Sequence, residues 1–165
     1  MKRFFVSFFL CICALSAMSQ VQFSKFQFIR DEPFGAFKGR KAITCKFKNI
    51  SNKQLKYVKV WYYAVNAVGD VVSGRDRGFM FLGKEYIKPK RLDMTGPFDA
   101  NKSYGRYAGA IITATDKNTR AVPFALTIVY MGSDEEIDIL ITKDNIKEYF
   151  PKLQWVDYNR WNNEL

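Results

Sequence analysis

The chain has 165 residues, of which 26 are Lys or Arg and 16 are Asp or Glu, so its formal net charge is +10. It contains no histidine, which excludes the commonest general base, the commonest zinc ligand and every Ser-His or Cys-His catalytic arrangement. The length is sufficient for one domain with a hydrophobic core of its own. We therefore expect a non-enzymatic domain without a cofactor.

The N-terminal residues have the three regions of a secretory signal peptide. Basic residues Lys2 and Arg3 precede an apolar run over residues 4–15 and the small-residue site 17–19. We expect cleavage after Ser19 and no integral membrane anchor, because the apolar run is too short to span a bilayer. The protein is then exported, and its destination is the periplasm, the cell surface or the medium.

Alternating apolar and polar residues predict most of the strands. The central stretch, residues 55–65, is the clearest, because β-branched and aromatic residues dominate it. Its wetter face is expected to carry Lys59 and Trp61, and its drier face Val60 and Tyr62. Strands are also expected at residues 21–29, 41–49, 104–115, 121–130 and 136–141, with an edge strand or a loop at 79–82 and a turn at Gly96-Pro97-Phe98.

The C-terminal residues 142–165 change character and predict a short helix. Thr142 or Asp144 is expected to cap a helix over residues 145–150, which Pro151 ends. The aromatic residues beyond it would form an unusual apolar patch in a free tail, so we expect the tail to dock. The expected organisation is a signal peptide at 1–19, a sandwich domain at 20–141 and a docked helical tail at 142–165.

Several short motifs recur together in one group of proteins. They are the turn Asn49-Ile50-Ser51-Asn52-Lys53, the strand start at 55–60, the corner at 66–72, the turn Gly96-Pro97-Phe98 and the hairpin Tyr130-Met131-Gly132-Ser133. With them the chain resembles small exported bacterial β-sandwich proteins in the style of FxLYD-type, immunoglobulin-like domains. The resemblance implies an all-β, immunoglobulin-like antiparallel β-sandwich, and it brings no catalytic residue to carry over.

Aromatic and basic residues are the candidate binding groups. Aromatic residues in strands more often belong to the core, but exposed ones form a stacking surface for glycans or for a protein partner. A charged loop at 73–78 contributes two arginines. The candidate binding residues are Trp61, Tyr63, Trp155, Trp161, Arg75 and Arg77.

Acidic residues gather near the closing hairpin, at Asp134, Glu136 and Asp138. They are the weak candidates for a metal site, but they lack the Asp-x-Asp-x-Asp-Gly spacing that lets carboxylates converge on calcium, so we expect a solvated hairpin tip. Cys45 alternates with apolar neighbours, which favours a buried, unreactive thiol.

The expected function is that of an exported interaction module. Its partner would be an envelope or surface protein, engaged through loops or by strand addition along an uncovered edge. The alternative is a glycan-binding protein, or less readily a glycan-cleaving one, that uses the aromatic and acidic residues. Nucleic acid is not expected as a partner of an exported protein.

Overall fold

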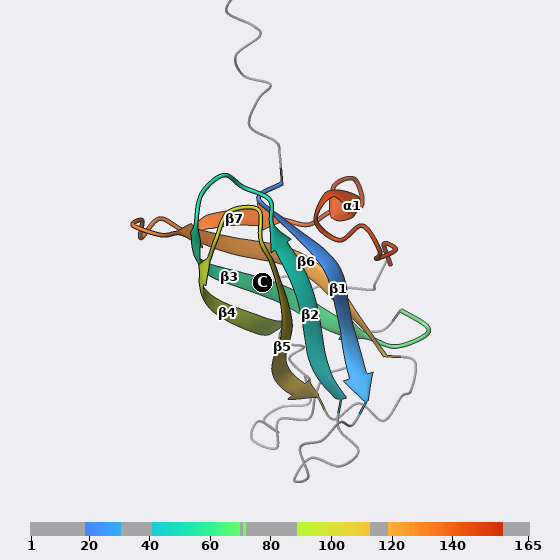
Figure 1. Cartoon of the computed structure of the whole chain (residues 1–165). Coiled ribbons are helices and arrows are strands. Elements are labelled where there is room, and N and C mark those ends of the chain that lie inside the picture. The colour runs from blue at the N-terminus through green and yellow to red at the C-terminus, as the bar shows by residue number, and fades with distance from the viewer. Residues whose placement is uncertain (1–18, 31–40, 70, 72–88, 113–118, 157–165) are drawn as a thin grey trace, which may run out of the picture.

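The computed structural model describes residues 19–30, 41–69, 71, 89–112 and 119–156, although the side chains of 29–30, 41–42 and 106–112 lie outside the description. Within these ranges the chain forms seven strands and one short helix, arranged as two antiparallel sheets that face each other (Figure 1). The strands of one sheet run across those of the other in Figure 1. The all-β, two-sheet fold predicted from the sequence is confirmed.

Each sheet combines strands that are distant in the sequence. The first sheet has the order β1-β2-β5, and the second has the order β4-β3-β6-β7. The strands are β1 (Val21–Arg30), β2 (Lys41–Asn49), β3 (Leu55–Val65), β4 (Lys90–Phe98), β5 (Ser103–Ile112), β6 (Arg120–Tyr130) and β7 (Ile137–Leu140), and the helix is α1 (Ile146–Tyr149).

The core lies between the two sheets and is rich in aromatic rings. In β3, Val58, Val60 and Tyr62 are fully buried, whereas Lys59 and Trp61 face outward, as the alternating pattern predicts. The Phe47 ring from β2 and the Phe98 ring from β4 meet edge to face at 5.0 Å between centroids, an arrangement that aromatic pairs prefer. These contacts join the two sheets.

The predicted burial of Cys45 is confirmed, because only 1% of this residue is exposed. Its thiol points across the core at Met94 of the opposite sheet, with 3.3 Å between the two sulfur atoms. Burial raises the pKa of Cys45 to about 12, since a thiolate would be poorly solvated there. The residue therefore packs as a small apolar side chain.

A β-bulge in β1 explains an irregular spacing in its sequence. Phe23 and Phe26 both face the core, although they are three residues apart. The pairing of β1 with β2 shifts register between Phe23 and Lys25, so Ser24 is an extra residue opposite the ladder. Because of this extra residue, the Phe26 side chain points into the core as the Phe23 side chain does. In a regular strand, residues three apart would point to opposite faces.

The predicted turn at Gly96-Pro97-Phe98 is wrong, because these residues form the end of β4, a strand that the sequence did not predict. Pro97 is tolerated because β4 is an edge strand with no second partner among the described strands. Gly96 is required there, since a Cβ atom would lie 2.5 Å from the Leu55 carbonyl oxygen. The chain instead turns after Phe98, where Asn101 adopts a positive φ of 60°. The edge strand or loop expected at 79–82 lies outside the described residues.

The segment after β7 folds back on β1. The helix is confined to α1, and the Phe150 ring after it stacks on Phe23 at 4.6 Å between centroids. The predicted cap at Thr142 or Asp144 is wrong, because Asn145 occupies the N-cap position and its side-chain oxygen accepts a hydrogen bond from the Thr142 N–H instead. No helix in the described ranges is long and apolar enough to cross a bilayer.

Candidate binding surface

The outward face of the second sheet carries one row of side chains across all four of its strands. The strand register aligns Arg91 of β4 with Trp61 of β3, Trp61 with Ala125 of β6, and Ala125 with Leu140 of β7. Directly paired residues in a sheet point to the same side, so these four side chains form a continuous strip, which we call the Trp61 row. Leu140 is 63% exposed, which is high for a large apolar side chain.

A bulge in β6 places a stacked pair of aromatic rings beside the Trp61 row. Trp61 pairs with Ala125 but Tyr62 pairs with Pro123, so Phe124 is an extra residue in β6. Its ring stacks on that of Tyr63, with 4.7 Å between centroids and 25° between planes. Bulges of this kind re-aim side chains and are common near functional sites.

The Trp61 indole is held from two sides. The Arg91 guanidinium lies over its ring at 5.1 Å from the centroid, a cation–π contact. Both guanidinium nitrogens that face Asp93 bind its carboxylate, at 2.7 and 2.9 Å. On the other side, the indole N–H donates to the Thr127 hydroxyl at 3.4 Å. These contacts within the sheet fix the orientation of the ring.

Next to the Trp61 row, the register aligns Asp93, Lys59, Thr127 and Asp138 across the same four strands. The Thr127 hydroxyl donates to the Asp138 carboxylate at 2.7 Å. Lys59 forms an ion pair with Glu136. This second row is polar, and charges of both signs alternate along it, so the surface combines an apolar strip with a charged margin.

The acidic candidates at the hairpin are not brought together. Asp134 binds Lys56 at 3.1 Å, and this hydrogen bond raises the pKa of the lysine. Glu136 binds Lys59 and Asp138 accepts from Thr127, so each carboxylate has a different partner. Among the described residues, no group of three or more His, Cys, Asp or Glu side chains is placed to hold a metal ion.

The aromatic candidates are separated in the structure. All three side chains are half-buried, but Trp61 and Tyr63 share the outward face of the second sheet, whereas Trp155 packs against the hydrophobic core. Trp161, Arg75 and Arg77 lie outside the described residues.

Sequence reasoning missed three contributors to this surface, Arg91, Phe124 and Leu140. The alternation of polar Arg91, Asp93 and Thr95 with buried Leu92 and Met94 was the available signal for a strand here. No comparable signal existed for Phe124, because its outward position depends on a bulge within a continuous apolar run.

All four edge strands of the two sheets have irregular or short edges. Both β1 and β4 shift register along their pairing, at Ser24 and around Pro97, and β5 shifts register twice against β2. The fourth edge strand, β7, has only four residues. Bulges, Pro and short length are devices that block the addition of another strand.

The fold and this surface define an all-β sandwich with a preorganised aromatic and charged outer face. Comparisons of the chain with protein-family models, with curated proteins and with solved structures find no match. The function must therefore be argued from the surface itself.

Proposed function

We propose that the chain is an exported, non-enzymatic binding module that recognises a protein of the cell envelope or surface through the outward face of its β4-β3-β6-β7 sheet. The Trp61 row is the observation that carries this proposal. Trp, Tyr and Arg are the residues that dominate binding energy at protein interfaces, and Trp61, Tyr63 and Arg91 lie together here beside the exposed Leu140.

The order of the strands supports an immunoglobulin-like topology. Lettered A to G in chain order, the sheets are A-B-E and D-C-F-G. The immunoglobulin constant-type arrangement is A-B-E-D and C-F-G, so the two differ only in the sheet that the fourth strand joins. We propose that this domain is a variant of that fold.

The face is a better candidate than the edges for the docking of a partner. Strand addition needs a regular, uncovered edge whose N–H and C=O groups can pair with the incoming chain. The bulges in β1, β4 and β5 and the short β7 work against this mode.

A glycan-binding function is less well supported by the geometry. Sugar rings stack on an open aromatic face, but the Arg91 guanidinium already lies over the Trp61 ring. A sugar would have to displace this guanidinium, which Asp93 holds through two contacts.

The test is affinity capture from the native envelope fraction with the wild-type protein and three variants. We expect one saturable protein partner whose Kd rises about thirtyfold or more, or about 2 kcal/mol, in Trp61→Ala, as at interface hot spots. Arg91→Ala should weaken binding in the same direction. Val68→Ala removes apolar area that is 77% exposed but lies outside the face, and it should bind like the wild type. Recovery of polysaccharide alone, or equal binding by all variants, would refute the proposal.

A further inference from the structure

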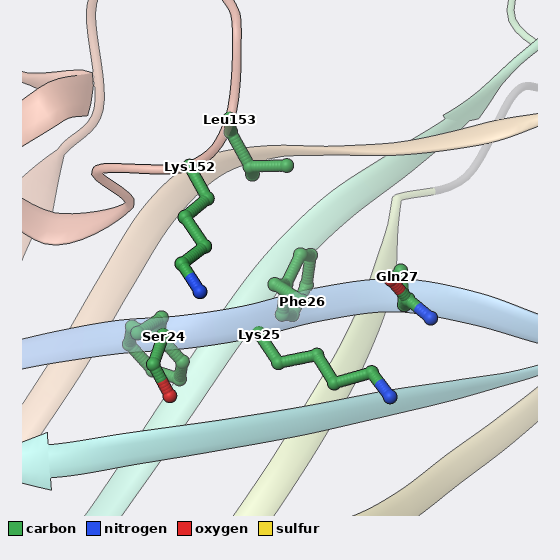
Figure 2. Close-up of a pocket in the computed structure, with 7 residues that line it drawn as sticks. Ser24, Lys25, Phe26, Gln27, Lys152 and Leu153 are labelled. Atoms are coloured by element: carbon green, nitrogen blue, oxygen red, sulfur yellow. The ribbon is translucent and has the colours of Figure 1, made fainter.

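A pocket of about 350 Å³ lies between β1 and the segment that follows α1. Its volume is at the lower end of the range for small-molecule sites. Figure 2 shows Lys152 and Leu153 reaching from this segment toward the strand. The strand contributes Ser24, Lys25, Phe26 and Gln27 to the lining.

The inner wall of the pocket is apolar. Phe26 belongs to the core and is only 4% exposed. Leu153 is half-buried and packs against the same core from the opposite wall. A hydrocarbon group in this half-open pocket would contact carbon atoms on two sides and lose part of its exposure to water.

The outer part of the pocket is cationic. Lys25 and Lys152 are both exposed and both line it. In Figure 2 the Lys152 side chain reaches toward β1 and ends near Ser24, whereas the Lys25 side chain extends away from it across the strand. None of the ion pairs formed among the described residues involves either lysine, and none of the described residues that line the pocket is acidic. The Ser24 hydroxyl and the Gln27 amide add neutral polar groups.

We propose that this pocket binds an anionic amphiphile, that is, a carboxylate or phosphate group joined to a short hydrocarbon chain. The anionic group would lie between Lys25 and Lys152, and the hydrocarbon would lie against Phe26 and Leu153. Charge complementarity selects an anion over a cation. An added strand is a poor occupant, because the bulge at Ser24 breaks the regular edge of β1. The pocket is separate from the Trp61 row, so this site is independent of the proposed partner surface.

The test is a calorimetric titration of the purified protein with decanoate, with decanol and acetate as controls. Decanoate should occupy one saturable site. Decanol, which has the chain without the charge, and acetate, which has the charge without the chain, should each bind at least about tenfold more weakly. Equal affinity for decanoate and either control, or no saturation below about 1 mM decanoate, would overturn the proposal.

Substitutions locate the site. Lys25→Gln and Lys152→Gln should each raise the Kd for decanoate about threefold to tenfold through the loss of one charge-assisted contact. Lys143→Gln is the matched control, because Lys143 is exposed on the same C-terminal segment but does not line the pocket. An equal effect of all three substitutions would mean that the binding of decanoate depends only on the net charge of the protein. The proposal that decanoate binds in this pocket would then be wrong.

Vesicles distinguish the two sources of such a ligand. If the ligand is a free acid, vesicles of phosphatidylcholine with and without phosphatidylglycerol change the decanoate titration to the same extent, because decanoate partitions into both. If it is an anionic lipid in a bilayer, the vesicles with phosphatidylglycerol compete with decanoate, and Lys25→Gln and Lys152→Gln weaken this competition more than Lys143→Gln. Competition weakened equally by all three substitutions would exclude a lipid at this pocket.

Discussion

Asn49 is fully buried, and each hydrogen-bonding group of its side chain has a partner. Its amide nitrogen donates to the carbonyl oxygens of Lys53, at 2.9 Å, and of Phe98, at 3.0 Å. Its side-chain oxygen accepts from both the backbone N–H and the hydroxyl of Ser51. One residue therefore shapes the turn between β2 and β3 and ties it to the end of β4.

Asn49→Ala should lower the free energy of unfolding by about 2 to 4 kcal/mol, because it removes all four hydrogen bonds of this side chain, including the buried bond to the Phe98 carbonyl. Urea denaturation followed by fluorescence measures this loss. Asn52→Ala in the same turn is the control, since Asn52 is exposed, and it should change stability by no more than about 0.5 kcal/mol. Similar losses in both variants would show that the turn, and not the Asn49 bonds, carries the effect.

At the scale of elements, the strands that alternate strictly were predictable from the sequence. The bounds expected for β2 and β3, at 41–49 and 55–65, agree with the structure, because each has a dense run of strand-forming residues between clear turns. The strand β4 was not predicted, because a Gly-Pro pair such as Gly96-Pro97 is typical of a turn. An edge strand tolerates this pair, since Pro need not donate a hydrogen bond to a second neighbour.

The candidate surface was predictable only in part. Trp61 and Tyr63 were found because they alternate with buried residues within one strand. The alignment of Trp61 with Arg91 and Leu140 depends on pairing between strands far apart in the sequence. A period of two within a strand carries no information on that register.

The turn between β4 and β5 provides a prediction on pH. The Asp99 carboxylate accepts hydrogen bonds from Lys102 at 2.8 Å and from Gln54 at 2.7 Å. The bond from Lys102, followed by that from Gln54, holds the pKa of Asp99 below its usual value of 3.8. A lowered pKa means that folding favours the ionised form, so its contribution to stability is present above about pH 4 and is lost as the pH falls through the folded pKa.

Wild-type protein should therefore be more stable than Asp99→Asn at about pH 7, and this difference should shrink as the pH falls below about 4 and through the folded pKa of Asp99. Thermal unfolding of both proteins across this range measures it. Asp144→Asn, which alters an exposed carboxylate, should show no such pH-dependent difference. A gap between wild type and Asp99→Asn that stays constant with pH would contradict the assigned role of the carboxylate.

At the scale of the whole molecule, the two faces of the second sheet differ in character. Its inner face carries fully buried residues such as Val60 and Leu126, which hold the sandwich together. Its outer face carries the Trp61 row and the stacked Tyr63–Phe124 pair, and the Trp61 ring is held by Arg91 and Thr127. Such preorganisation lowers the entropic cost of binding, which is why we propose this face as the partner surface.

Site-specific photo-crosslinking in the native cell tests this placement most directly. A photoreactive amino acid replaces Leu140 on the outer face or, in a separate protein, the exposed Asn52 in the turn between β2 and β3. We expect a single protein adduct from position 140, which Trp61→Ala abolishes, and no adduct from position 52. An adduct from position 52 alone, or one from position 140 that survives Trp61→Ala, would contradict it.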